Sequence, residues 1–518
     1  MATDFPSRAF ADMSTLLAGQ AAQLGNHPAL VLDNRTLNYA ELNQAADRVA
    51  AALQRDGIRP RDAVAFCARM SIEYVTALLG ALRAGATVVP LQTTLRPQTL
   101  AQMMSDCSAR LLFLDELNGV RLRKLERIDA LRVALDNSDA GEPWQRWLAA
   151  PGTVPQPVVI TPRSRFAIIY SSGTTGTPKG VVQSHGMRWA GMAAAPALGF
   201  DTRTVTLVST PLYSNNTLVT LLPTLAHGGR VVLMPTFDPR GFLELSVQHQ
   251  VTHAMLVPTQ YQRILALPEF DRYDLSSYRW KFATGEHFPP ALKAEVVRRW
   301  PGELAEFYGL TEGGGNTLLL ASHYPDKLHT VGQPVPGHSI RIVDDKGREV
   351  PVGEPGEIVG RAPGVMDGYL NRQRESIDLE WRDAAGYVYL RSGDMGKFDA
   401  QGFLTLLERK KDLIISGGFK IYPSDLEGVL IVHEEVADVA VVGVPSAEWG
   451  ETPVAFVVLR TAGRISADSL RAWADARLGK VQRLADLVLL PELPRSPVGK
   501  VLRRKLRDGW LAQQRRRG

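Results

Sequence analysis

Short apolar runs alternate with longer amphipathic segments through the first half of the chain, and this rhythm restricts the fold more than any other feature of the sequence. Over residues 41–55, the side chains of Leu42, Ala45, Val49 and Leu53 fall on one face of a helix. Strand–helix–strand repeats predict a mainly parallel sheet with helices on its faces, and therefore an α/β fold. The elements expected here are strands at 62–67, 87–91, 166–170, 204–208, 230–234 and 253–257, helices at 41–55 and 74–84, and a loop region at 136–164.

The pattern changes beyond about residue 330, where short β segments are separated by Gly and Asp turns. Such spacing predicts an antiparallel or β-barrel-like piece. The segments are 339–345, 356–361, 386–390 and 402–409.

The last part of the chain has the pattern of a small α+β domain that ends in a basic tail. We place the domain boundary at Lys411, because a charged residue between two apolar strands is typical of an exposed linker. This boundary predicts a large N-terminal domain over 1–410 and a small C-terminal domain over 411–518. The elements expected in the small domain are helices at 424–431 and 467–478 and strands at 437–444 and 453–459.

Composition excludes several classes of protein. Of the 518 residues, 45% are hydrophobic and 22% are charged, which is typical of a folded chain with more than one domain. The net charge of +5 is too small to indicate a nucleic-acid partner. Cys67 and Cys107 cannot form a disulfide framework, and no Cys/His cluster has the spacing of a zinc site. Without a secretory signal or a run near ~18 apolar residues, we expect a soluble cytoplasmic enzyme with no membrane span. A monomer and a homodimer both stay open.

A loop rich in glycine and hydroxyl groups follows the strand at 166–170, where residues 170–180 read YSSGTTGTPKG. Its backbone N–H groups, its hydroxyls and Lys179 are suited to wrapping the oxygens of a polyphosphate. The loop is not a Walker A motif, because Pro178 precedes the lysine and Gly180 follows it. A plain surface loop is the alternative, but it would not need this combination directly after a buried strand.

Five further motifs lie between residues 40 and 506, some before this loop and some after it. Together with the loop they resemble the motifs of the adenylate-forming superfamily, which contains acyl-CoA synthetases, aryl-CoA ligases, luciferases and peptide-synthetase adenylation domains. The acyl-CoA synthetase branch is the best match. The five motifs are Ala84-Gly85-Ala86 with Pro90-Leu91, Tyr308–Glu312, Ser392–Asp394, Glu408–Asp412 with Ser416–Gly418, and Pro494–Lys500.

The resemblance implies a two-step reaction. A carboxylate is a poor electrophile, so the acid first attacks the α-phosphate of ATP and forms an acyl-adenylate with release of pyrophosphate. A thiol, here that of coenzyme A, then displaces AMP. The first step brings two anions together, and their repulsion is reduced mainly by positioned cations and Mg²⁺.

The resemblance also assigns roles to single residues. Thr311 would bind the α-phosphate, Glu312 would hold Mg²⁺ with Thr175 as a weaker second contact, and Lys500 would bridge the carboxylate, the α-phosphate and the ribose during adenylation. Tyr308 would stack on adenine. The residues assigned to ATP or AMP are Ser171, Ser172, Gly173, Thr174, Thr175, Gly176, Thr177, Lys179, Gly285, Glu286, Tyr308, Gly309, Asp394 and Arg409.

The second step would need the small domain to rotate, so that Lys500 leaves and the thiol arm enters. By resemblance, Lys411 is the hinge, and Gly417 and Gly418 line the thiol tunnel, where backbone without side chains allows close approach. A tight turn between strands is the structural alternative for this glycine pair. Lys420 departs from the Asn or Gln common in the family.

The segment 211–216 distinguishes the acid. Ser214 replaces the family's histidine, and the segment lacks the Asp that amino-acid-activating relatives use to pair the substrate ammonium. An amino-acid substrate is therefore disfavoured, and Gly313, Gly314 and Gly315 would leave room for an aryl or fatty chain, unless they only permit a backbone turn. The predicted pocket walls are Trp189, Tyr213, Asn215, Val257, Thr259, Gly285, Gly309 and Gly313–Asn316, although Trp189 is also a candidate for the core.

These observations favour an ATP-dependent acid–CoA ligase. A stand-alone acyl-AMP ligase that loads a carrier protein is the nearest alternative, and the absence of a carrier domain after Lys500 favours free CoA. A luciferase-like oxygenase and a non-catalytic nucleotide-binding relative are weaker alternatives. A degenerate relative would be expected to have lost at least one of six residues that are all present: Lys179, Thr311, Glu312, Asp394, Arg409 and Lys500.

Overall fold

The computed structural model describes residues 10–123, 130–171, 178–417, 419–446, 448–479, 482–495 and 501–517. They form an α/β protein that divides into two compact units. Unit 1 takes its residues from Met1–Ile340 and Gly360–Leu390, and unit 2 takes its residues from Arg341–Val359 and Arg391–Gly518. The chain passes between the units inside β17 (Ser339–Val343), β18 (Gly356–Arg361) and β21 (Val388–Phe398).

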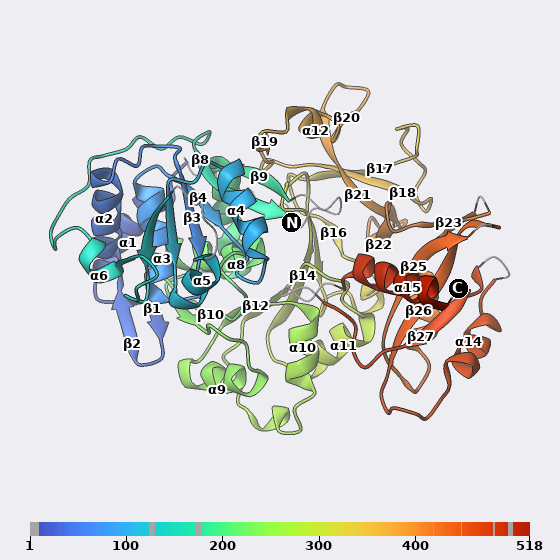
Figure 1. Ribbon diagram of the computed structural model, residues 1–518. Helices are drawn as coiled ribbons and strands as arrows, with labels where there is room; N and C mark the ends of the chain where they lie inside the picture. Colours follow the sequence, from blue (N-terminus) through green and yellow to red (C-terminus); the bar gives the residue numbers. More distant parts are fainter. Residues whose placement is uncertain are drawn as a thin grey trace. The chain divides into compact units, whose positions relative to one another are not determined.

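An eight-stranded sheet in unit 1 is parallel in its centre. The order of the strands is β19 (Gly368–Tyr369), β9 (Lys179–Ser184), β8 (Arg165–Ser171), β4 (Thr87–Pro90), β3 (Ala63–Cys67), β5 (Leu111–Leu114), β6 (Leu131–Ala134) and β7 (Glu142–Pro143). β8 and β9 pair antiparallel, and so do β9 and β19. Figure 1 shows β3, β4 and β8 side by side.

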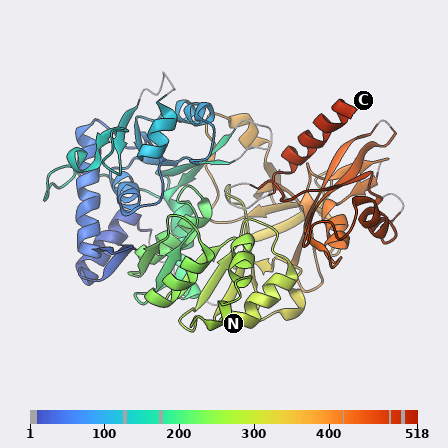
Figure 2. The same cartoon turned by 60° about the horizontal axis from the view of Figure 1, so that its bottom comes forward.

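A nine-stranded sheet, also in unit 1, has a parallel centre and antiparallel edges. Helices α9 (Pro239–His249), α10 (Pro258–Leu265) and α11 (Pro290–Arg299) pack on one face of it, and Figure 2 brings these green helices forward. The order is β16 (Gln333–Pro334), β15 (Thr317–Leu320), β14 (Glu303–Tyr308), β13 (Trp280–Ala283), β12 (His253–Leu256), β10 (Val205–Val208), β11 (Arg230–Leu233), β1 (Pro28–Leu32) and β2 (Arg35–Asn38).

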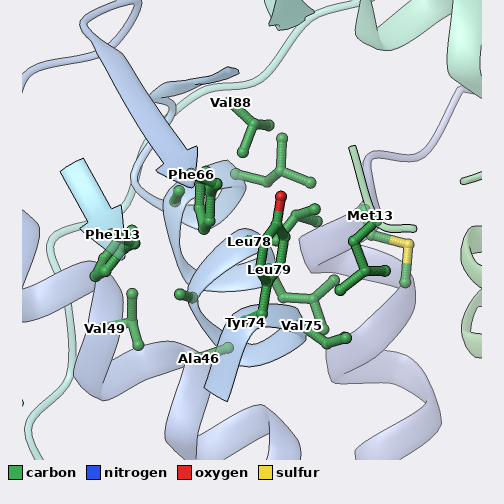
Figure 3. Packing of buried hydrophobic residues seen from close by; sticks show 14 of the residues in the cluster. Met13, Ala46, Val49, Phe66, Tyr74, Val75, Leu78, Leu79, Val88 and Phe113 are labelled. Carbon is green, nitrogen blue, oxygen red and sulfur yellow. The ribbon is translucent and has the colours of Figure 1, made fainter. Parts of the chain in front are cut away.

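The largest hydrophobic cluster joins the two sheets through the helices between them. The helices are α1 (Met13–Leu24), α2 (Tyr39–Arg55), α3 (Ile72–Arg83) and α8 (Asn215–Ala226), and Figure 3 shows part of their packing around Phe66 and Tyr74. Because strand side chains alternate, Phe66 faces this cluster while Cys67 faces a second one under α4 (Pro97–Asp106) and α5 (Glu116–Leu122). Full burial of a phenylalanine side chain such as that of Phe66 contributes roughly 1.5–3 kcal/mol to the stability of the fold.

Local sequence explains where these helices begin and how closely they pack. The Asn38 side chain accepts a hydrogen bond from the backbone N–H of Glu41, and the Glu41 carboxylate accepts one from the backbone N–H of Asn38, so α2 begins with a capping box. α3 lacks a side chain at Gly80, where a Cβ would lie only 2.3 Å from the Cβ of Val49 on α2. The glycine therefore sets the close approach of the two helices. Among the described residues, no helix is both long and apolar enough to cross a membrane.

Unit 2 contains most of the β-barrel-like piece and all of the α+β domain that the sequence predicted. A five-stranded sheet runs β17, β18, β21 and β20 (Glu380–Arg382), with β22 (Leu404–Arg409) on β21, and of these strands β20 belongs to unit 1. A second five-stranded sheet runs β24 (Phe419–Ile421), β23 (Ile414–Ser416), β26 (Gly450–Leu459) and β25 (Val436–Ser446), with β27 (Asp486–Leu489) on β26. The helices are α13 (Pro423–Ile431), α14 (Ala467–Asp475) and α15 (Arg503–Arg517). The boundary predicted at Lys411 stays a prediction, since residues on both sides of it belong to unit 2.

One segment differs from the sequence prediction. The stretch 136–164, expected as a loop, includes β7 and the short helix α6 (Trp144–Trp147), because Trp144 and Trp147 are buried against the core. The β23–β24 hairpin places Gly417 in a turn between two strands, which agrees with the structural alternative given for the glycine pair.

One buried ion pair attaches α11 to β14. Lys293 and Glu306 are 2% and 3% exposed, and their side chains form a salt bridge. Burial raises the pKa of Glu306 to about 7 and lowers the pKa of Lys293, and the opposite charge of each partner counteracts these shifts. Breaking such a pair by removing one partner leaves an uncompensated charge.

We predict that Lys293→Met destabilises the protein in a pH-dependent way. Without the ammonium, the pKa of Glu306 rises further above its unfolded value. Folding then favours the protonated acid, so stability is retained at low pH and lost as pH rises through the folded pKa. The expected loss is about 3 kcal/mol at pH 8 and much less at pH 5, measured by urea unfolding at each pH. The double variant Lys293→Met/Glu306→Leu should lose this pH dependence, and an equal loss at both pH values would contradict the assignment.

Candidate active site

Parallel strands of the nine-stranded sheet end at a common edge, and predicted site residues follow each of these ends. Tyr213 and Asn215 come after β10, Thr259 after β12, Gly285 after β13, and Tyr308 ends β14. Ligands of open α/β sheets bind outside the carboxyl ends of the strands. The topology therefore brings predicted acyl and nucleotide residues to one edge. A Cβ added at Gly285 would lie 3.0 Å from the Asn216 side chain, which agrees with close packing there.

The β8–β9 hairpin holds the two ends of the glycine-rich loop. Ser171 pairs with Lys179 in the ladder, and Tyr170 pairs with Gly180. The Tyr170 hydroxyl lies 2.7 Å from Asp106 Oδ2 and 3.0 Å from the Met103 carbonyl, so it ties the hairpin to α4. The predicted phosphate contacts between these ends lie outside the described residues: Ser172, Gly173, Thr174, Thr175, Gly176 and Thr177.

Tyr369 connects Lys179 with Glu312, and sequence reasoning missed it. Its hydroxyl donates a 2.8 Å hydrogen bond to Glu312 Oε1, and the Lys179 ammonium lies 5.1 Å from its ring centroid. Tyr369 reaches this position because β19 pairs with β9, with Tyr369 opposite Val181. This contact joins segments almost two hundred residues apart, and no local pattern around Tyr369 signals it.

Lys179 also forms an ion pair with Glu375, whose carboxylate oxygen lies 2.5 Å from the ammonium. The hydrogen bond from Lys179 lowers the pKa of Glu375, so the carboxylate is ionised at neutral pH. Glu375 follows β19 in the short helix α12 (Gln373–Ile377). An anion that binds Lys179 must therefore compete with this carboxylate.

The Tyr308–Glu312 segment leaves β14 and runs into three glycines with positive φ, Gly313 at 80°, Gly314 at 87° and Gly315 at 109°. A Cβ at Gly313 would lie 2.3 Å from the Gly364 carbonyl oxygen, and one at Gly314 would lie 3.2 Å from the Gly360 carbonyl oxygen. Backbone conformation and close contact therefore account for these glycines. Their predicted role as walls of an acyl pocket stays a prediction. Gly309 is similarly confined, because a Cβ there would lie 2.2 Å from Asn316 Oδ1.

The predicted acyl-pocket side chains occupy different environments. Tyr213, Asn215 and Thr259 are partly buried, and burial raises the pKa of the Tyr213 phenol to about 12. Trp189 packs against the largest hydrophobic cluster, and its ring lies 6.2 Å from that of Phe10 in an edge-to-face arrangement. Glu286, assigned to the nucleotide, is partly buried next to Gly285.

A second feature absent from the sequence predictions is a polar network at the far end of β9. The Arg188 guanidinium donates from Nη2 to Gln183 Oε1 and, at 2.6 Å, to Asn215 Oδ1. The Gln183 amide in turn donates a 2.9 Å hydrogen bond to the Thr311 carbonyl. This network links helix α7 (His185–Ala194) to the predicted acyl and phosphate residues.

His185, which begins α7, is buried and its Nε2 has no hydrogen-bond partner among the described residues. Burial lowers its pKa to about 4, so the ring is neutral at physiological pH. It packs edge-to-face on Phe166 with the ring centroids 5.1 Å apart. A structural role therefore accounts for it.

In unit 2, two residues that the sequence analysis assigned to the nucleotide, Asp394 and Arg409, pair with each other. Asp394 on β21 lies opposite Arg409 on β22, and Arg409 Nε lies 3.0 Å from Asp394 Oδ1. The Asp394 side chain is 13% exposed and that of Arg409 is 43% exposed, so the carboxylate is largely enclosed while the guanidinium reaches solvent. A carboxylate can accept hydrogen bonds through both of its oxygens, as the predicted nucleotide contact of Asp394 would require.

The remaining predicted residues of unit 2 follow β22. Lys411 is exposed in the turn after that strand. Gly417, at φ 56°, lies in the turn between β23 and β24 and donates its N–H to the Trp449 carbonyl at 2.8 Å. Lys420 on β24 forms a 2.7 Å ion pair with Asp345. Gly418 and Lys500 lie outside the described residues.

Comparison with known proteins gives two family matches. The family described as "AMP-binding enzyme" matches residues 17–370, and the family "AMP-binding enzyme C-terminal domain" matches residues 425–500. The chain is 31% identical to the fatty acid–[acyl-carrier-protein] ligase ScoC of Streptomyces coeruleorubidus, over 95% of each protein. It is 33% identical to the indoleacetate–CoA ligase of Aromatoleum aromaticum, over 93% of this chain and 94% of that protein.

The fold is similar to a solved structure of ATP-bound MatB from Rhodopseudomonas palustris. The TM-score is 0.84 at 27% identity, with 96% of this chain and 99% of the other covered. The sequence match and the structural match therefore both extend over nearly the whole chain.

We predict that Glu375→Gln strengthens ATP binding by about two- to fivefold, because it removes the carboxylate that competes with phosphate for Lys179. Titration of the protein with ATP and Mg²⁺ at several salt concentrations would measure the effect, which should shrink as salt rises. Glu73→Gln, which removes the carboxylate of a different surface ion pair with Arg35, is the matched control and should leave the affinity unchanged. Weaker binding in Glu375→Gln would refute the competition.

Proposed function

Because the chain belongs to the AMP-binding enzyme family of adenylate-forming enzymes, we propose that it is an ATP-dependent acid–CoA ligase. The observation that carries the proposal is the connection of Lys179, at the end of the glycine-rich loop, with Glu312 through Tyr369. A cation and a carboxylate held on either side of one tyrosine suit a site that receives a polyphosphate and its metal ion.

In the first half-reaction, a carboxylate oxygen of the acid attacks the α-phosphorus of ATP. An oxygen–phosphorus bond forms, the bond to the pyrophosphate oxygen breaks, and pyrophosphate leaves. We assign Lys179 to the departing phosphates and the Thr311 hydroxyl to the α-phosphate. Asp394 and Arg409 are assigned to the ribose hydroxyls, and Tyr308 to adenine. Positioned charges of this kind are the main source of catalysis in phosphoryl chemistry.

Mg²⁺ would be held by Glu312. The donor set fits, because Mg²⁺ is usually bound by one or two carboxylates together with substrate phosphates. Tyr369 donates to one oxygen of Glu312 and so orients the carboxylate. Among residues with described positions, no group of three or more His, Cys, Asp or Glu could hold a metal by itself. When bound, the ion would neutralise charge on the phosphate oxygens.

In the second half-reaction, the CoA thiolate attacks the acyl carbon, a carbon–sulfur bond forms, and AMP leaves with the electrons of the acyl–oxygen bond. We assign Gly417 and Gly418 to the passage of the thiol arm and Lys411 to the hinge. Domain alternation would move Lys500 away before the thiol enters.

The acid is proposed to be an aryl or fatty acid and not an amino acid. The segment 211–216 contains no carboxylate that could pair with a substrate ammonium. Relatives at about 30% identity are named for indoleacetate and for fatty acids.

We predict that Lys500→Ala lowers the rate of adenylate formation by about 100- to 1,000-fold, because it removes the cation that bridges the reacting anions. Conversion of supplied acyl-adenylate to thioester should continue, since the thiol step takes place without this lysine. Pyrophosphate release measures the first step, and thioester formation from synthetic adenylate measures the second. Lys505→Ala, which changes an exposed lysine of α15, is the matched control. Adenylation that survives the Lys500 change would contradict the role.

The acceptor has one serious alternative, a carrier protein, because ScoC is named as a ligase for an acyl-carrier protein. We predict that pyrophosphate release across short, medium, branched and aromatic acids is followed by acyl transfer to CoA. The measurement compares products with CoA and with a holo carrier protein. If thioester forms on the carrier protein and not on CoA, the protein is a ligase that loads a carrier protein and not an acid–CoA ligase. Release of no AMP or pyrophosphate with any acid would refute adenylation itself.

A further inference from the structure

We propose that Arg188 forms an anion subsite in the acyl-binding part of the active site, and that the acid activated by this enzyme carries a second oxyanion, such as another carboxylate. The inference rests on the proposed function, because it concerns the acid that is adenylated. It narrows that acid from any aryl or fatty acid to one with two negatively charged groups.

The contacts of Arg188 leave much of its donor capacity unused. Its Nη2 donates to Gln183 and Asn215, and both acceptors are neutral amide oxygens. Its Nε is buried and has no hydrogen-bond partner in the described part of the chain. The guanidinium also lies over the ring of Phe166, 5.5 Å from the centroid. Phe166 is 1% exposed, so the arginine points into the interior and not toward the outer surface.

The positive charge is not compensated by the described residues. None of the carboxylates among them forms an ion pair with Arg188, and burial lowers the pKa of its guanidinium to about 10. At neutral pH the group therefore stays charged. A deeply placed cation is costly unless an anion accompanies it. The residue as a whole is intermediate between buried and exposed.

The position of Arg188 assigns the missing anion to the acid and not to ATP. Lys179 is the first residue of β9, whereas Arg188 lies in α7, which follows the last residue of that strand. The backbone of Lys179 and the start of α7 are therefore separated by the length of a six-residue strand, roughly 16–20 Å. Asn215, which receives a hydrogen bond from Arg188, is one of the predicted acyl-pocket residues. Gln183, which receives another, binds the Thr311 carbonyl, so the subsite lies next to the segment assigned to the α-phosphate.

The chemistry of the group favours an oxyanion. A guanidinium is planar, always charged at neutral pH and able to donate two parallel hydrogen bonds to a carboxylate. A purely apolar acyl chain would have to leave this charge without a partner. An acid with a second carboxylate at its far end supplies the partner and fixes the orientation of the chain.

The test compares matched acids with the wild-type protein in acid-dependent ATP–pyrophosphate exchange. The pairs are hexanoate with hexanedioate, octanoate with octanedioate, and phenylacetate with 1,4-phenylenediacetate. We expect kcat/KM to be at least about 10-fold higher for the best diacid than for its monoacid. A preference for the monoacid in every pair would overturn the subsite while leaving the proposed function intact. Exchange with no acid of either kind would overturn the proposed function and the subsite together.

Substitutions separate an anion subsite from a structural role. Arg188→Met keeps an unbranched apolar stem and removes the guanidinium with its charge, and it should lower kcat/KM for the diacid by about 100-fold, mainly through KM, with little change for the monoacid. Arg188→Lys keeps the charge and should retain an intermediate preference for the diacid over the monoacid. This variant tests the anion subsite even if the methionine variant fails to fold. Arg203→Met, at an exposed arginine paired with Asp201, is the control. An equal loss for both members of a pair would mean that Arg188 only supports the structure.

Discussion

The register of β9 is the constraint on which the candidate site depends. Lys179, Val181 and Gln183 alternate along this strand and therefore share one face. Pairing with β8 sets the start of the strand at the glycine-rich loop, and pairing with β19 places Tyr369 opposite Val181. A shift of one residue would turn this whole face to the other side of the sheet. One backbone ladder thus holds together the lysine, the tyrosine next to Glu312, and the glutamine that binds the Thr311 carbonyl.

Much of the fold could be predicted from local patterns, because buried parallel strands are continuous apolar runs and their helices keep a regular apolar face. The predicted strands at 62–67 and 166–170 are observed as β3 and β8. Contacts between distant segments carry no such signal. Tyr369 joins the site only through the pairing of a two-residue strand with β9. Arg188 lies in a helix whose pattern says nothing of whether a carboxylate will lie nearby.

The glycines illustrate a second limit of the sequence. A run such as Gly313–Gly315 is compatible with an open cavity and with a backbone that needs positive φ, and composition cannot separate the two. The structure supplies the second reason directly, because all three residues have positive φ and pack against other backbone atoms or core side chains. The same holds for Gly417, whose turn connects β23 and β24. A functional role for these glycines would have to be additional to the conformational one.

Buried cations among the described residues are compensated in different ways, and Arg188 lies next to a predicted acyl-pocket residue without a carboxylate partner. Lys281 donates to the carbonyls of Pro301 and Gly302, and burial lowers its pKa to about 7, so a lysine can release its proton when its surroundings oppose the charge. Lys293 forms an ion pair with Glu306, and Arg503 forms one with Glu427 at 2.6 Å. Arg188 is compensated in neither of these ways, because a guanidinium does not release its proton at neutral pH and the acceptors of its hydrogen bonds are neutral amides. Because no described carboxylate pairs with Arg188, an anion supplied by the substrate is the compensation that we propose.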